Sequence, residues 1–187
     1  PVAARDNVEV AAKAAIAQAA LAQVPTTGAV IVDAGTTTDR FLELIPDDYE
    51  LTIITNSVAH AFRLSTRPNL TALFIGGRLR PNTLACVDQW ALDALAGIYA
   101  DVALVGTNGV SVDRGLTTPD PAEASVKRAM LRAAGHRVVL ADHTKFGVNH
   151  FAQFGSIDDF DVLVTDRATP SEQLDAMNRA GKTVVIA

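Results

Sequence analysis

The sequence predicts an α/β fold with a mostly parallel sheet flanked by helices. Short runs that are apolar almost throughout alternate with helical stretches along all 187 residues, as expected for parallel strands buried on both faces. Several of these runs end in turns of Gly, Asn or Thr. Hydrophobic residues make up 49% and charged residues 20% of the chain, which excludes a disordered protein and allows one buried core. We expect a single domain over residues 1–187.

The first half of the chain sets this alternation. Residues 7–23 are dense in Ala and predict a helix that stops near Pro25. The β-branched run at 29–33 predicts a buried strand, and the residues after Gly35 predict a helix that runs toward Leu44. The pattern then repeats with a strand at 51–55, a helix at 58–64 and a strand at 70–75.

The second half of the chain continues in the same way. Helices are expected at 88–97, 121–134 and 170–180, and strands at 101–106, 137–142, 160–166 and 182–187. Two loops that contain Pro, 78–83 and 113–121, are expected to be mobile flaps. No repeat of fixed period and no low-complexity linker divides the chain.

Charge and composition exclude several classes of function. The 16 basic and 21 acidic residues give a net charge of −5, whereas a protein that grips duplex DNA by itself is expected to be basic. Aromatic residues, at 5%, are too few for a platform that stacks single-stranded bases. No apolar run reaches the roughly 18 residues that cross a bilayer. The single Cys86 cannot form an internal disulfide, so we expect a cytoplasmic protein without membrane contact.

The turn richest in chemistry follows the first strand, where residues 33–38 are DAGTTT. Gly35 allows a sharp turn with exposed amide groups, and the hydroxyls of Thr36, Thr37 and Thr38 then begin a helix. Free amides, the positive end of a helix and hydroxyl donors together suit a phosphate or a carboxylate. A helix cap alone needs a single hydroxyl, so the motif favours an anion site.

Three further turns follow neighbouring strands: TNS at 55–57, Gly76-Gly77, and GTNG at 106–109. Each alone is a weak signal, because Asn-Ser most often caps a helix and Gly-Gly most often makes a turn. Parallel strands nevertheless bring such turns to one edge of the sheet, where ligands bind in these folds. The candidates that follow are Asn56, Gly77, Asn108 and Gly109.

Three charged residues are further candidates. Glu123 and Lys127 lie four apart on a predicted helix, and this spacing alone predicts a solvent-exposed ion pair worth about a few tenths of a kcal/mol. Lys145 follows the strand at 137–142 and can reach the same edge of the sheet, where its ammonium group suits phosphate.

Motifs of several enzyme and cofactor classes are absent. The Gly-Lys-Thr at 181–183 lacks the glycine that a P-loop requires five residues earlier, since that position is Ala176. No G-x-G-x-x-G follows a strand, and no G-x-S-x-G is present. The four histidines have no metal-ligand spacing, and Cys86 predicts a packed side chain. We therefore expect no metal, no cofactor and no catalytic residue.

Six motifs occur in a fixed order along the chain. They are DAGTTT (33–38), TNS (55–57), GGRLRPNTLA (76–85), GTNGV (106–110), RGLTTPDPAEASVKRAM (114–130) and ADHTKFG (141–147). In this order they resemble the C-terminal sensor domain of DeoR-type bacterial transcriptional regulators, from about Arg5 to Asp166. The resemblance implies a fold related to ribose-5-phosphate isomerase and to the sugar-phosphate and coenzyme A transfer enzymes. It also implies a phosphorylated sugar or related metabolite as effector, and a homo-oligomer.

The resemblance further implies roles for single residues. The backbone of Gly35 and the hydroxyls of residues 36–38 match the turn that cradles phosphate in this fold, and Asp33 matches the acid that ends the strand. The other matched positions are Asn56, Gly77, Asn108, Gly109, Glu123, Lys127 and Lys145. By this analogy Lys127 and Lys145 contact the negative charge of the ligand. This role of Lys127 replaces the solvent-exposed ion pair with Glu123 that the spacing predicts.

The sequence departs from the family pattern in two places. Family members normally carry an N-terminal winged helix-turn-helix domain, and no such segment precedes Arg5. Operator DNA is therefore expected to be contacted only through a domain that is missing from this chain. His143 stands near Lys145 where the family more often has Ser.

Three functions stay open at this point. The first is the ligand-sensing domain of a repressor of sugar metabolism, in which the effector orders the flaps 78–85 and 113–121 and shifts the subunits. The second is an aldose–ketose isomerase or amino-sugar-phosphate deaminase of the same fold. Such an enzyme needs a carboxylate as general base. The residue at the position expected for this base is Asn108, and Glu123 is the only obvious substitute. The third is an assembly module that binds no ligand, and packing alone does not require the DAGTTT motif. We favour the sensor domain and predict no enzyme activity.

Overall fold

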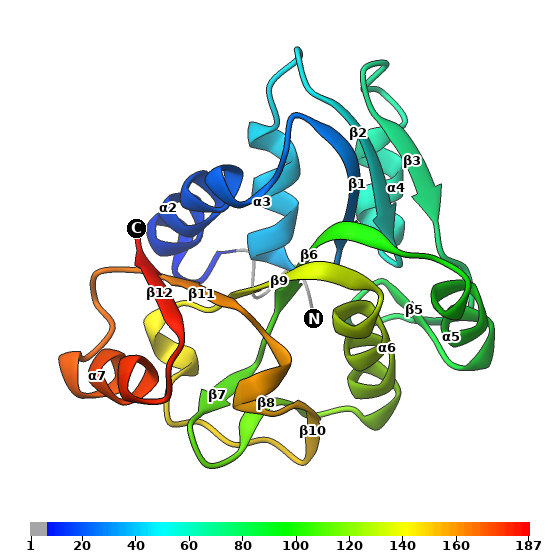
Figure 1. Cartoon of the computed structure of the whole chain (residues 1–187). Helices are drawn as coiled ribbons and strands as arrows, with labels where there is room; N and C mark the ends of the chain where they lie inside the picture. The colour runs from blue at the N-terminus through cyan, green and yellow to red at the C-terminus, as the bar shows by residue number, and fades with distance from the viewer. Residues whose placement is uncertain (1–6) are drawn as a thin grey trace.

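Seven parallel strands form the central sheet (Figure 1). In the computed structural model, which describes residues 7–187, every neighbouring pair of this sheet runs parallel. The strands across the sheet are β12 (Thr183–Ile186), β11 (Val162–Thr165), β9 (Ala134–Leu140), β6 (Ala100–Gly106), β1 (Thr27–Val32), β2 (Glu50–Thr55) and β3 (Thr71–Phe74). The predicted fold class is confirmed.

Helices cover both faces of the sheet, because its central strands are apolar on both sides. Val30 and Val32 pack in one hydrophobic cluster with α2 (Val10–Ala20), α3 (Thr36–Leu44) and α4 (Val58–Leu64). Ile31 points to the opposite face and packs in the cluster of α5 (Gln89–Ala96), α6 (Pro121–Arg132) and α7 (Ser171–Arg179). Short 3₁₀ turns complete the elements: η1 (Leu21–Gln23), η2 (His143–Lys145) and η3 (Ile157–Asp159).

The chain changes direction across the sheet between β1 and β6. From β1 it moves outward to β2 and then β3, and it returns to β6 on the other side of β1. From there it continues to β9, β11 and β12. Such a switch point opens a crevice at the carboxyl ends of the two strands, which is where ligands bind in open parallel sheets.

Two small sheets lie outside the central one. β4 (Arg78–Arg80) pairs with β5 (Ala85–Val87) as an antiparallel hairpin. β8 (Gly115–Thr118) pairs on both sides, with β7 (Gly109–Ser111) and with β10 (Ala152–Gly155).

The expectation of a flap at 113–121 is wrong for residues 115–118. Leu116, Thr117 and Thr118 are 0% exposed, and β8 is the middle strand of its sheet. Residues 78–80 of the other expected flap likewise form a strand, β4, although an exposed one. Strands of three or four residues that are followed by a proline carry little periodic signal, so partners distant in the sequence decide their structure.

No helix within residues 7–187 has both the length and the apolar character needed to span a bilayer.

Replacing Leu116 with Ala tests whether β8 belongs to the core. The side chain is fully buried, so the change is expected to lower the free energy of unfolding by about 2–5 kcal/mol, through lost burial and a residual cavity. Urea unfolding followed by circular dichroism measures it. Val112→Ala is the control, because Val112 is 39% exposed and its loss should stay within about 0.5 kcal/mol. Equal, small losses at both positions would mean that residues 115–118 form a loose flap.

Candidate functional site

A cavity of about 120 Å³ lies at the switch point of the sheet. Its walls come from the turns after β1, β6 and β9, from α6, and from the hairpin of β4 and β5. Val8 and Lys13, at the start of the described chain, close the remaining side. The position is the one that the topology of the sheet predicts for a ligand.

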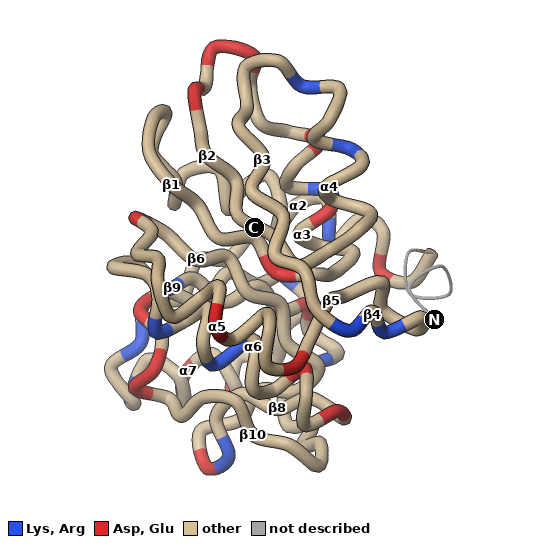
Figure 2. Tube along the Cα trace, turned by 90° about the vertical axis from the view of Figure 1, so that its right-hand side faces the viewer, with Lys and Arg blue, Asp and Glu red and all other residues tan. Residues whose placement is uncertain are grey.

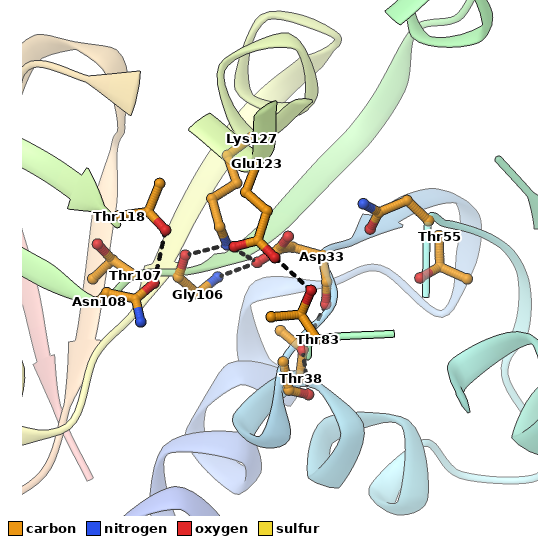
Figure 3. Close-up of polar contacts among 12 residues, drawn as sticks. Asp33, Thr38, Thr55, Thr83, Gly106, Thr107, Asn108, Thr118, Glu123 and Lys127 are labelled. Atoms are coloured by element: carbon orange, nitrogen blue, oxygen red, sulfur yellow. Dashed lines mark hydrogen bonds and ion pairs between the residues drawn. The ribbon is translucent and has the colours of Figure 1, made fainter. Parts of the chain in front are cut away.

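A buried charge pair forms the floor of this cavity (Figure 3). The Nζ atom of Lys127 contacts Oδ2 of Asp33 and donates a hydrogen bond of 2.9 Å to the carbonyl oxygen of Gly106. The amide of Gly106 donates to the same Oδ2 at 3.2 Å. Lys127 is 6% exposed and Asp33 is 2% exposed. One side chain of α6 thus fixes that helix to the ends of β1 and β6.

Burial dominates the electrostatics of this pair. It raises the pKa of the Asp33 carboxyl above its ordinary value, and the Lys127 ammonium group acts in the opposite direction. The Nζ atom of Lys127 also lies 5.6 Å from the centre of the Phe154 ring, a distance that favours a cation.

Glu123 connects α6 to the hairpin above the cavity. Its Oε1 atom accepts a hydrogen bond of 2.5 Å from the hydroxyl of Thr83 and contacts the guanidinium of Arg80. Arg80 also lies 3.1 Å from Asp120, which caps the start of α6 by accepting from the amide of Glu123. The expected solvent-exposed pair of Glu123 and Lys127 is therefore wrong. The spacing of four residues does not show what α6 packs against. Glu123 and Lys127 are both buried, and each has its partner on another element.

The DAGTTT turn presents the amino end of α3 to the cavity. The N-cap is Gly35, which has no side chain to satisfy the first amides of the helix. The hydroxyl of Thr38 holds the turn by donating to the carbonyl oxygens of Asp33, at 2.6 Å, and Gly35, at 2.9 Å. Within residues 7–187, the hydroxyls of Thr36 and Thr37 have no hydrogen-bond partner, and both residues line the cavity.

His60 supports this turn from behind. Its Nε2 atom lies 3.3 Å from the carbonyl oxygen of Gly35 and its Nδ1 atom lies 3.3 Å from the hydroxyl of Thr55. The residue is 1% exposed, and burial lowers the pKa of its imidazole to about 4. The ring is therefore neutral at neutral pH, and its two contacts join α4 to the ends of β1 and β2.

The other charged residues of the lining are arranged in pairs. Lys145 donates to the hydroxyl of Thr144 at 2.9 Å and lies 3.6 Å from Asp142. Lys13 of α2, only 4% exposed, adds a third ammonium group to the lining. Because Glu123 has Arg80 and Asp142 has Lys145, each carboxylate in the lining is balanced by a base.

The start of α2 is tied to the turn that carries Lys145. The Nε2 atom of His143 lies 3.9 Å from Oε2 of Glu9, and its Nδ1 atom lies 2.9 Å from Oδ2 of Asp166. The amide of His143 also donates to Asp166 at 2.7 Å. The histidine that departs from the family pattern is thus the link between the wall formed by residues 8–13 and the end of β11.

Comparison with known proteins places this geometry in a family. Residues 8–167 match the family described as the DeoR C-terminal sensor domain. The chain belongs to this family. The sensor domain is 35% identical over 173 residues to the HTH-type transcriptional regulator GlpR of Haloferax volcanii, covering 92% of this chain and 68% of that protein. It is 28% identical to the glycerol-3-phosphate regulon repressor of Escherichia coli, covering 84% and 63%. The chain thus spans about two thirds of these relatives.

Solved structures show the fold of the sensor domain. Ribose-5-phosphate isomerase A from Methanocaldococcus jannaschii superposes with a TM-score of 0.53 at 15% identity, covering 72% of this chain and 53% of that one. The beta subunit of eIF2B from Chaetomium thermophilum gives 0.54 at 17% identity, covering 81% and 47%. The expected relation to the isomerase fold is confirmed, and at such identities the likeness shows the fold alone. Because the family consists of sensor domains and the named relatives regulate transcription, a regulatory role rather than an enzyme is also confirmed.

Most of the site residues predicted from the sequence meet in the cavity of the sensor domain. The lining contains Gly35, Thr36, Thr37, Thr38, Asn108, Glu123, Lys127 and Lys145. Asp33 lies beneath them, bonded to Lys127. The side-chain oxygen of Asn108 accepts from the hydroxyl of Thr118 at 3.0 Å, which orients its amide.

Besides Asp33, three predicted residues lie outside the lining. Asn56 follows β2, farther from the switch point, and donates to the carbonyl oxygen of Cys86 at 2.8 Å. Gly77 has a φ of 151°, and a Cβ there would lie 2.4 Å from the carbonyl oxygen of Val87. A Cβ on Gly109 would lie 2.1 Å from that of Val148. The two glycines thus permit close backbone contacts, and the turns after β2 and β3 support the hairpin.

Several lining residues are not predicted from the sequence. Thr107 directly follows β6, and Asp142 lies two residues after the end of β9, so the rule that polar residues after strands form sites would have found them. Thr83 and Lys13 carry no such signal, because one lies in a hairpin loop and the other is a polar residue of an Ala-rich helix. Across residues 7–187, no group of three or more His, Cys, Asp or Glu side chains is placed to hold a metal ion.

His60→Gln tests the support of the turn through its pH dependence. The unfolded imidazole has a pKa near 6.5 and the folded one about 4, so between these values the unfolded chain binds more protons. The stabilisation from neutral His60 is complete above pH 6.5 and is lost as the pH falls toward 4, by about 2–3 kcal/mol.

The measurement is urea unfolding of both proteins at pH 7 and at pH 4. The difference in unfolding free energy, wild type minus variant, is expected to decrease at the lower pH. A difference that does not change with pH would show that His60 is not buried as a neutral ring.

Proposed function

We propose that this sensor domain binds a phosphorylated sugar or a sugar-like phosphorylated metabolite in the cavity at the switch point. Binding would control how a helix-turn-helix domain of the whole regulator holds operator DNA, and so repress or release genes of carbohydrate metabolism. As part of such a regulator the domain would work in the cytoplasm as a homo-oligomer, without membrane contact.

One observation carries the proposal: the amino end of α3 opens into a cavity that also holds ammonium groups. The first amides of α3 follow Gly35, and the hydroxyls of Thr36 and Thr37 stand beside them. A helix amino end carries about half a positive charge and binds phosphate through its amides. Lys13, Lys127 and Lys145 add full charges to the same lining. A phosphate has up to two negative charges and several acceptor oxygens, which this set of donors matches.

The remaining polar groups of the lining suit the hydroxyls of a sugar. Glu123 and Asp142 present carboxylate oxygens as acceptors, and Asn108 and Thr107 present an amide and a hydroxyl. A balanced set of acceptors and donors is what a polyhydroxylated molecule needs, whereas inorganic phosphate alone would leave the acceptors unused. One relative is named for the glycerol-3-phosphate regulon, which is in keeping with a phosphorylated polyol or sugar.

The walls of the cavity suggest how a bound ligand would be sensed. Val8 and Lys13 belong to the first described turn and to α2, and Glu9 beside them contacts His143. The opposite wall is the hairpin, held through Thr83 and Glu123. A ligand that binds Lys13 and Glu123 more tightly in one arrangement of these walls shifts the domain toward that arrangement.

Lys145→Gln tests the proposal with little damage to the fold. Lys127 is less suitable, because its removal leaves Asp33 buried without a partner, at a cost of about 3–5 kcal/mol. Thermal melting of the wild type is measured across a panel of phosphorylated sugars and polyols, with the unphosphorylated compounds and inorganic phosphate as controls. A cognate ligand at about 100 times its Kd stabilises the fold by about 2.7 kcal/mol and raises Tm.

The variant is compared by calorimetric titration with the best compound of the panel. Lys145→Gln is expected to weaken binding by about 10-fold or more, as the loss of a charge-assisted hydrogen bond does. Arg179→Gln removes the same charge from an exposed position on α7 and should bind like the wild type. An unchanged Tm across the whole panel, or equal affinities of the two variants, would contradict the proposed site.

A further inference from the structure

β3 is an edge strand whose outer side has no partner strand among residues 7–187. The amide of Ile75 donates to the carbonyl oxygen of Thr55 of β2 at 2.8 Å. Because the backbone groups of successive strand residues point to alternate sides, those of Leu73 also point to β2, and those of Ala72 and Phe74 point outward. All residues of β3 are exposed, so these outward amides and carbonyls are accessible along the edge.

Apolar side chains flank this edge. Phe74 is 46% exposed and Leu73 is 48% exposed, one on each face of the sheet. Phe74 shares its face with Thr55, its register partner on β2, whose hydroxyl contacts α4 through His60. On α4 itself Phe62 is 79% exposed. A solvent-exposed aromatic beside an open strand is typical of a contact surface, since single exposed residues of this size are usually scattered.

The same side of α4 continues into the hairpin. Val58 is 39% exposed and Leu84 is 37% exposed, and they are neighbours because the amide of Val58 donates to the carbonyl oxygen of Leu84 at 3.0 Å. We call the set formed by Val58, Phe62, Leu73, Phe74 and Leu84 the β3 edge surface.

Charge is absent from the strand at the centre of the β3 edge surface. The sequence from Leu70 to Gly77 has no charged side chain, and Figure 2 shows β3 facing the viewer as an unbroken uncharged trace. Edge strands of monomeric proteins are normally protected from pairing with another chain by Lys, Pro, a bulge or a covering element. In the described part of the chain β3 has none of these, whereas the other edge strand, β12, is half-buried at Val184 and Val185.

A second copy of this chain is the partner that such a surface fits. In a two-fold contact each surface meets its own copy, so a charge at the centre would face the same charge. An uncharged strand avoids this repulsion, and its outward groups are the same in both copies. A strongly charged partner gains nothing from this strand, since the strand has no opposite charge to guide or select it.

We infer that the β3 strands of two copies pair antiparallel about a two-fold axis and join the two sheets into one. The outward groups allow a register in which Leu73 lies opposite the partner's Leu73, and Ala72 exchanges backbone hydrogen bonds with the partner's Phe74. Leu73 and Phe74, which lie on opposite faces of the joined sheet, then lose exposed apolar area at the contact. Residues 71–74 of β3 contribute nothing to the lining of the cavity, so the pairing is tested without a ligand.

Sedimentation equilibrium of the 187-residue chain tests the pairing. The wild type is expected to have twice the mass of one chain. Phe74→Lys places two like charges on one face of the joined sheet, diagonal to each other across the two-fold axis. Ala72→Pro removes an outward amide without touching the ladder to β2, as edge strands permit. Each variant is expected to weaken the dimer by about 10-fold or more while its Tm at low concentration stays that of the wild type.

Phe151→Lys is the matched control, because Phe151 is 82% exposed and lies next to β10, outside the β3 edge surface. It is expected to keep the mass of the wild type. Hydrogen exchange gives a second reading, since the amides of Ala72 and Phe74 should be protected at high concentration and exchange rapidly after dilution.

Three results would overturn the inference. The first is a wild type with the mass of one chain, which would leave the edge to another occupant. The second is a dimer that both Phe74→Lys and Ala72→Pro leave intact. The third is a dimer that only Phe151→Lys dissociates.

Discussion

The buried pair of Lys127 and Asp33 is the interaction on which the site depends. It joins α6 to the ends of β1 and β6 at the place where the chain changes direction across the sheet. Breaking a buried pair by removing one partner costs about 3–5 kcal/mol, because the other charge stays in a poorly solvated place. The pair therefore fixes the position of α6, and with it Glu123 and the hairpin that Glu123 holds.

The cavity combines rigid and movable parts. The ends of the strands and the first turn of α3 are set by the core, since Val32 and Phe41 are fully buried on either side of that turn. The loop of the hairpin meets α6 through polar side chains, of Thr83 and Arg80 with Glu123, and Glu9 at the start of α2 meets His143. A ligand between these walls would bind to a fixed anion site and alter the weaker contacts around it, as a sensor requires.

Much of the fold could be predicted because its central strands are long and apolar on both faces. The strand at 29–33 and the helix at 58–64 correspond to β1 and α4 within a few residues. β8 could not be found, because a run of four residues next to Pro119 has no period of its own. It is buried only through pairing with β7 and β10.

The site was predictable where it follows the ends of central strands. Residues 35–38 and Asn108 meet in the cavity for this reason, whereas Asn56 and Gly77 follow strands that the sheet order places outside it. Lys127 was first assigned to a solvent-exposed pair, because the spacing to Glu123 does not show that Asp33 lies beneath the helix. The most direct test of the anion site is a nuclear magnetic resonance titration of the amides of residues 36–38 with a phosphorylated sugar and with the same sugar lacking phosphate. If the amino end of α3 binds phosphate, these amide signals shift with the phosphorylated compound alone. Signals that stay unchanged here, while others shift at a different place in the fold, would contradict it.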